Sequence, residues 1–86
     1  MAVDWEPLRE KLDQHYDWPA LYTFKFIVPK DKARELKDLF PKHETTEKVS
    51  KNGNYISVTI EMMMPGSTEV IDVYKSVSVV EGVITL

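Results

Sequence analysis

The side chains best suited to binding a metal ion lie close together in the middle of the chain. His43, Glu44 and Glu47 are the one such group of near neighbours in the sequence. A strand beginning at residue 44 would place Glu44 and Glu47 on opposite faces, because successive side chains alternate. Nothing in the spacing brings His15 near them. The pattern therefore favours ordinary surface residues, and we expect no metal ion and no other cofactor.

Nucleophilic chemistry is equally poorly supported by the residue types and their spacing. Ser50 and Ser57 carry hydroxyls, but neither lies in the strand–turn–helix pattern of a nucleophile elbow. No spacing pairs either serine with a histidine base. The chain has no cysteine, which excludes thiolate catalysis and disulfides. We expect no catalytic residues and a protein that is not an enzyme.

Length and charge narrow the classes of partner. The 86 residues are enough for one domain. With 11 basic and 14 acidic residues the net charge is −3, which argues against duplex nucleic acid or an anionic membrane as the main partner. No apolar stretch is long enough to span a bilayer, and the first residues do not resemble a secretion signal. We expect a cytoplasmic protein.

The stretch from Ser50 to Ile60 carries the clearest structural signal. Asn52-Gly53 predicts a type I′ hairpin turn, in which both central residues have positive φ. Apolar and polar residues then alternate strictly. This period of two predicts a half-buried antiparallel strand, with one apolar face and one polar face that carries Tyr55 and Ser57.

Similar patterns predict the remaining elements. Asp4 is a candidate N-cap for the first helix, Asp31 for the second and Ser67 for the third. Apolar residues at helical or alternating spacing predict helices over residues 5–16, 31–40 and 68–80, and strands over residues 21–28, 44–51 and 83–86.

After the first helix, these elements follow the order β-α-β-β-α-β. That order predicts an α+β, ferredoxin-like two-layer sandwich with an antiparallel sheet and an extra N-terminal helix. Right-handed crossovers place the first and third strands in the centre. We divide the chain into an N-terminal helical extension, residues 1–18, and a ferredoxin-like domain, residues 19–86. The helix carries an apolar stripe that includes Trp5 and Leu12, which we expect to pack on its own domain rather than on a second copy.

The sheet face opposite the helices is the most promising contact surface. We expect Lys25 and Tyr55 to be neighbours on the central strands. The candidate interaction residues are Lys25, Lys48, Ser50, Lys51, Tyr55 and Ser57. RNA-recognition motifs share this layout, but a single tyrosine falls short of their paired aromatic platform, so we expect no nucleic-acid partner. Acylphosphatases share it too, but the turn Pro29-Lys30-Asp31 lacks the glycine and arginine of a phosphate-binding loop.

Several segments together resemble the YbeD-like family of small, uncharacterised bacterial proteins. The most specific is the run Ser50-Lys51-Asn52-Gly53-Asn54-Tyr55-Ile56-Ser57-Val58, with support from residues 24–28, 69–74 and 82–84. The resemblance implies a ferredoxin-like fold similar to that of ACT regulatory domains. The family has no established activity and so implies no site residues.

We interpret the chain as a non-enzymatic, cytoplasmic regulatory or protein-interaction module. The alternative is a small-molecule-sensing, ACT-like domain that binds a metabolite at a dimer interface. A protein partner, a second copy of the chain and a small-molecule ligand all stay open, whereas nucleic acid and membrane are not expected.

Overall fold

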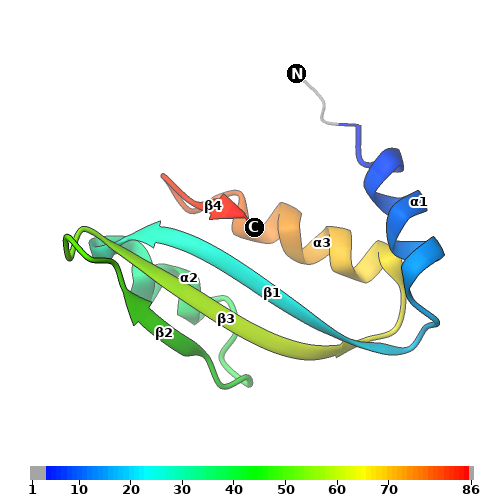
Figure 1. Cartoon of the computed structure of the whole chain (residues 1–86), viewed down its shortest axis with the longest axis horizontal. Coiled ribbons are helices and arrows are strands. Elements are labelled where there is room, and N and C mark those ends of the chain that lie inside the picture. The colour runs from blue at the N-terminus through cyan, green and yellow to red at the C-terminus, as the bar shows by residue number, and fades with distance from the viewer. Residues whose placement is uncertain (1–3, 86) are drawn as a thin grey trace.

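A four-stranded antiparallel sheet organises the chain in the computed structural model, which describes residues 4–85 (Figure 1). The strand order is β2-β3-β1-β4, so the first and third strands are central, as predicted. The elements follow one another as α1 (Glu6–His15), β1 (Ala20–Pro29), a 3₁₀ turn (Lys30–Lys32), α2 (Ala33–Asp38), β2 (Thr46–Val49), β3 (Tyr55–Met64), α3 (Ser67–Val77) and β4 (Ile84–Thr85). The α+β, ferredoxin-like prediction is confirmed.

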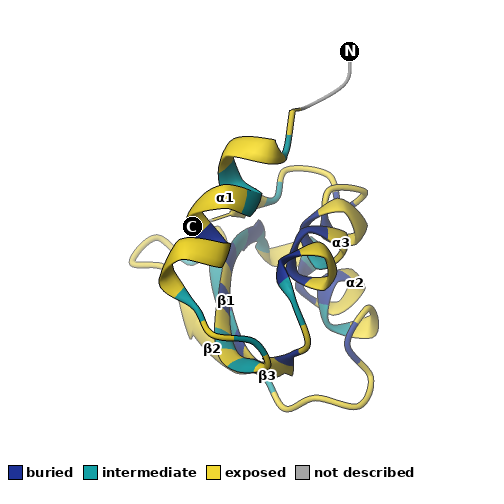
Figure 2. Ribbon diagram, turned by 90° about the vertical axis from the view of Figure 1, so that its right-hand side faces the viewer, coloured by how far each residue is buried: buried dark blue, intermediate teal, exposed yellow. Residues whose placement is uncertain are grey.

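The core lies between the sheet and helices α2 and α3. Figure 2 shows these helices on one side of the sheet, with buried residues where the two layers meet. Phe24, Phe26 and Ile60 are fully buried on the sheet, and they meet Leu36 of α2 and Ile71 of α3 in one apolar cluster. The alternation in β1 and β3 produces this layer, because every second side chain points toward the helices.

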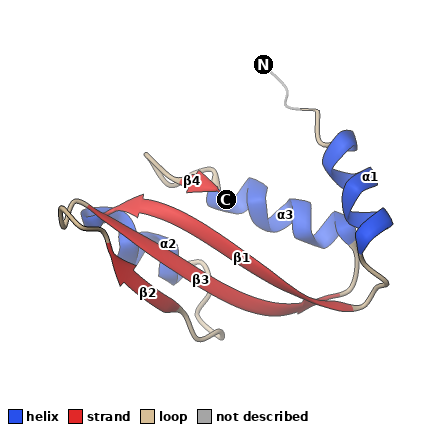
Figure 3. Cartoon of the chain, viewed as in Figure 1, coloured by secondary structure: helices blue, strands red, loops and turns tan. Residues whose placement is uncertain are grey.

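The two central strands are much longer than the two edge strands (Figure 3). β1 and β3 pair along their whole length, from Ala20 opposite Met64 to Pro29 opposite Tyr55. β2 pairs with residues 56–59 of β3, and β4 pairs only with Phe26 and Ile27. The remaining half of the β1–β3 pair has no neighbouring strand among the described residues and runs out toward α1.

The turn before β3 differs from the predicted type I′ turn. Gly53 has a φ of +74°, but no described residue other than glycine, and therefore not Asn52, has a positive φ. The Gly53 N–H donates to the Ser50 carbonyl at 2.9 Å, and the Ser50 N–H donates to the Tyr55 carbonyl at 2.8 Å. A longer hairpin loop needs only one residue with positive φ, and the single glycine supplies it.

All three predicted helix caps are also wrong, and the N-cap of α1 is Trp5 rather than Asp4. Asp31 lies inside the 3₁₀ turn, whose N-cap is Pro29, so the α-helix starts later than expected. Gly66, with extended backbone, is the N-cap of α3, and Ser67 is buried as the first helical residue. Asp4 lies one residue before the N-cap of α1, and its Oδ1 accepts a hydrogen bond from the Glu6 N–H at 3.1 Å.

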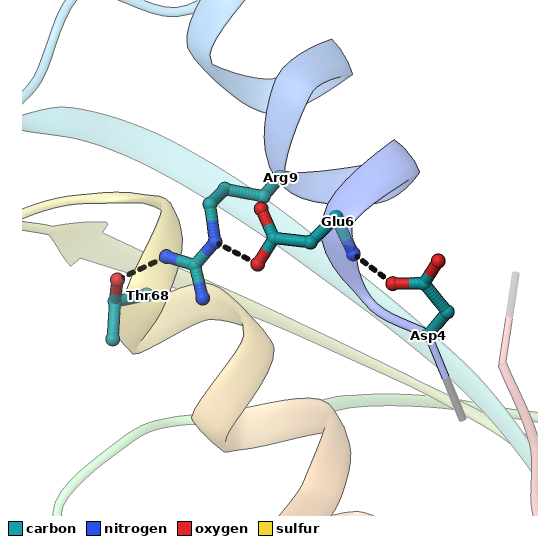
Figure 4. Close-up of polar contacts among 4 residues, drawn as sticks. All are labelled: Asp4, Glu6, Arg9 and Thr68. Atoms are coloured by element: carbon teal, nitrogen blue, oxygen red, sulfur yellow. Dashed lines mark hydrogen bonds and ion pairs between the residues drawn. The ribbon is translucent and has the colours of Figure 1, made fainter. Parts of the chain in front are cut away.

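Helix α1 packs against α3 and leaves the far face of the sheet uncovered. The rings of Trp5 and Tyr74 are nearly parallel, with centroids 6.5 Å apart, and Leu12 is buried in the common core. Arg9 pairs with Glu6 at 3.2 Å and donates a hydrogen bond to Thr68 at the start of α3 (Figure 4). The apolar stripe of α1 therefore packs on its own chain, as expected.

None of the helices formed by residues 4–85 is both long enough and apolar enough to cross a membrane.

Candidate functional site

The sheet face that no described helix covers, here called the open face, carries a mixed set of exposed side chains. Three large apolar residues lie on it with about half or more of their surface exposed: Leu21 at 54%, Met63 at 65% and Ile84 at 50%. Lys25 and Lys48 are exposed on the same face. Exposed apolar groups on an uncovered face make it a candidate contact site.

The strand register separates two residues that the sequence placed together. Lys25 lies opposite Thr59, whereas Tyr55 lies opposite Pro29, at the end of the β1–β3 pair. Four residues along a strand correspond to about 13 Å, so Lys25 and Tyr55 are not neighbours. The prediction is wrong because alternation fixes the face of a residue but not the register of its strand.

The other five candidate residues do come together. Lys48 lies opposite Ser57 in the strand register. These two residues and Ser50, Lys51 and Tyr55 line a shallow hollow of about 330 Å³ at the β2–β3 turn, together with Ile27 and Val49. Among the described residues, two lysines and no carboxylate line this hollow, so it is suited to negative groups.

The two serines of this hollow are already engaged in local hydrogen bonds. Ser50 Oγ accepts a hydrogen bond from the Tyr55 N–H at 3.1 Å. The Ser57 hydroxyl donates to the Lys48 carbonyl oxygen at 3.4 Å. These hydrogen bonds stabilise the β2–β3 hairpin, so a structural role is enough to explain why serines occur at positions 50 and 57. The lysine ammonium groups and the exposed Tyr55 side chain remain to meet a partner.

The lysines of the open face are free of ion pairs within residues 4–85. The ion pairs in that range are Glu6–Arg9, Lys32–Glu35 and Lys37–Glu47. Lys25, Lys48 and Lys51 take part in none of them. Along the described strands, Glu61 supplies the single carboxylate of this face. The open face is thus locally basic in a chain whose net charge is −3.

The residues considered for metal binding remain apart. Glu47 points to the helix side, where its carboxylate lies 3.0 Å from the ammonium of Lys37 on α2. In the part of the chain that the structure describes, no three histidine or carboxylate side chains form a group that could hold a metal ion.

A second hollow lies on the helix side and was not predicted. It has a volume of about 660 Å³ and is bordered by Trp5 just before α1, Leu8 of α1, Tyr22 of β1, Tyr74 of α3, and the C-terminal residues Ser78, Val80–Val83 and Thr85. We call it the aromatic hollow. Its volume is in the range of small-molecule sites.

Two tyrosine hydroxyls meet at the wall of the aromatic hollow. The hydroxyls of Tyr22 and Tyr74 are 2.8 Å apart and share a hydrogen bond. The pKa of Tyr74 is raised well above its ordinary value, mainly because the side chain is buried. The hydrogen bond with Tyr22 raises the pKa further. Both effects keep the Tyr74 hydroxyl protonated and uncharged.

The sequence offered no direct signal for the aromatic hollow. Trp5, Tyr22 and Tyr74 each occupy an apolar position of their own helix or strand, and periodicity assigns all three to a core. Their convergence depends on where α1 docks, which is a tertiary decision. A tryptophan at the start of an amphipathic helix was the one available hint.

Fold and surface together define the class: a small α+β, ferredoxin-like protein with an open sheet face. The model of a family described as "Protein of unknown function (DUF493)" matches residues 13–86. The chain belongs to this family, and the YbeD-like resemblance is confirmed.

One curated relative supports the same assignment. The chain is similar to a UPF0250 protein of Shewanella amazonensis, with 29% identity over 85 residues, covering 88% of this chain and 94% of the relative. No solved structure gives a significant match. The function of the family is not established, so a function for this chain is inferred from the residues of its own surface.

Proposed function

We propose that this chain is a non-enzymatic interaction module that binds an acidic segment of a partner protein on its open face. The observation that carries the proposal is the set of three lysines, Lys25, Lys48 and Lys51, which lack ion pairs within residues 4–85. They lie on or beside the one sheet face that the described helices leave bare. An acidic partner would neutralise this local charge. The attraction between the opposite charges would make association faster and more selective.

The apolar residues of the same face would supply most of the affinity. Leu21 lies opposite Met63 in the register, so the two form one exposed apolar pair at the outer end of the sheet. Burial of apolar surface contributes about 25 cal/mol per Å². A partner segment with glutamates and leucines would therefore match both halves of the open face.

Titration with a designed peptide tests this proposal. A short acetylated peptide of glutamate and leucine would be added to the ¹⁵N-labelled protein and followed by NMR, with the same peptide carrying glutamine in place of glutamate as the reference. We expect shifts at Lys25, Lys48 and Ser57, and weaker binding as salt is raised. Reversal of one charge with Lys48→Glu should weaken binding about fivefold at low salt, in line with an exposed ion pair.

Lys75→Glu is the matched control for this experiment. Lys75 is exposed on α3, away from the open face, and its substitution changes the net charge of the chain by the same amount. Equal weakening by Lys48→Glu and Lys75→Glu would mean that only net charge matters, and the proposal would fail. It would also fail if the glutamine peptide bound as well as the glutamate peptide.

The ACT-like alternative requires a dimer, and it stays a proposal together with a cytoplasmic location and a regulatory role. Light scattering separates the two functions: a stable dimer at micromolar concentration would favour the ACT-like alternative, and a monomer would favour the interaction module. Fractionation of cells that express the chain addresses the location.

A further inference from the structure

We propose that the aromatic hollow binds a small organic ammonium compound with an aromatic or apolar body. This site is separate from the open face, and the inference does not depend on the proposed function. It rests on the kind of side chains that border the hollow and on their charge.

Three aromatic rings from three different elements surround the hollow. Trp5 and Tyr74 lie with their planes 8° apart, and Tyr22 is nearly perpendicular to Tyr74, at 86° and 6.5 Å between centroids. All three rings border the hollow. The face of an aromatic ring is negative, so a cation that reaches one of these faces is attracted to it.

The polar groups of the hollow favour the same class of ligand. Within residues 4–85, Glu81 is the single charged residue that borders the hollow, and no lysine or arginine of that range does so. Ser78 and Thr85 add hydroxyl groups. The hydroxyl pair of Tyr22 and Tyr74 adds oxygen atoms that can accept a hydrogen bond from an ammonium group. A carboxylate beside aromatic faces binds a cation and repels an anion.

Size and apolar character set the body of the ligand. The volume of about 660 Å³ is larger than an ammonium ion alone needs. Leu8, Val80 and Val83 provide apolar walls next to the aromatic rings. A ligand with one flat or apolar group and one positive group would therefore use the hollow fully, with the positive group on the side of Glu81.

A series of three compounds of the same shape tests the inference. Phenethylamine is the cationic probe, phenethyl alcohol the neutral one and phenylpropanoate the anionic one. NMR titration of the ¹⁵N-labelled protein reports where each binds. We expect phenethylamine to shift the Trp5 indole and the amides of Gly82 and Thr85, and to bind about fivefold more tightly than the alcohol.

Glu81→Gln is the decisive variant because Glu81 is exposed and its loss should leave the core intact. We expect it to remove the preference for the amine over the alcohol. Glu10→Gln, at an exposed position of α1 outside the hollow, should leave that preference unchanged. The inference is overturned if phenylpropanoate binds as well as phenethylamine, if the shifts map to the open face, or if no compound causes shifts at millimolar concentration.

Discussion

At the scale of single residues, the two glycines with positive φ are needed for different reasons. Gly53 is needed for its backbone conformation alone, whereas Gly82 is needed both for its backbone conformation and for the space that a Cβ would fill. Gly53 has a φ of +74° with open space where a Cβ would lie. Gly82 has a φ of +79°, and a Cβ there would come within 2.9 Å of Pro29 Cγ. Gly82 thus fixes both the backbone and the close approach of the C-terminal segment to β1.

The pair provides a matched test of this reading. We expect Gly53→Ala to lower the free energy of unfolding by about 1–2 kcal/mol, the cost of a side chain in the left-handed region. Gly82→Ala should cost about 1 kcal/mol or more beyond that, because the proline ring cannot move aside easily. Urea unfolding measures both variants. Equal losses would show that the contact with Pro29 has no energetic weight.

The hydrogen-bonded hydroxyls of Tyr22 and Tyr74 predict that the stability of the protein responds to alkali. The pKa of Tyr74 is raised in the folded state, so above a pH of about 10 the unfolded chain releases its proton first. The free energy of unfolding should then fall as the pH rises. We expect Tyr74→Phe to reduce this slope, at a cost of about 1 kcal/mol at neutral pH for the lost hydrogen bond.

Chemical denaturation at neutral pH and above pH 10 would measure the effect. If the free energy of unfolding fell equally steeply with pH in the wild type and in Tyr74→Phe, Tyr74 would not be the group responsible.

At the scale of elements, α1 is the part whose position matters most for the aromatic hollow. It contributes Trp5 and Leu8 to the border and anchors itself through buried Leu12 and through the contact of Arg9 with Thr68. The family match begins at residue 13, inside this helix. The first part of α1, which includes Leu8, therefore lies outside the region that the family model matches.

Truncation of its anchor tests whether α1 folds as part of the main core. We expect Leu12→Ala to lower the free energy of unfolding by about 2–4 kcal/mol, because it leaves a cavity between helix and core. Lys11→Ala, on the exposed side of the same helix, should change it by less than about 0.5 kcal/mol. Thermal unfolding with a single transition should accompany both. A loss below about 1 kcal/mol for Leu12→Ala would mean that α1 docks only weakly.

At the scale of the whole molecule, the two candidate sites lie on opposite sides of the sheet and differ in the charged residues that they carry. The helix side carries the aromatic hollow with Glu81, and the open face carries Lys25, Lys48 and Lys51. A net charge of −3 conceals this separation, because it adds both sides together. Interaction with an acidic protein and with a small cation would therefore use different faces and need not compete.

The sequence by itself determined which elements form and in what order. Period-two alternation in β1 and β3 and the apolar stripes of the helices settle which side chains face the core, and Pro29, Pro41 and Gly66 limit the elements. These signals are local, because they depend on residues a few positions apart. Even so, the predicted type of the hairpin turn and all three predicted helix caps were wrong, since several residues compete for each end.

Only the tertiary structure decided which distant residues meet. The register of β1 against β3 separates Lys25 from Tyr55 and brings Lys48 opposite Ser57. The docking of α1 on α3 gathers Trp5, Tyr22 and Tyr74 around one hollow. Register and docking result from packing the whole core at once, so no local pattern carries them. The sites of this protein therefore depend on contacts that its sequence does not spell out.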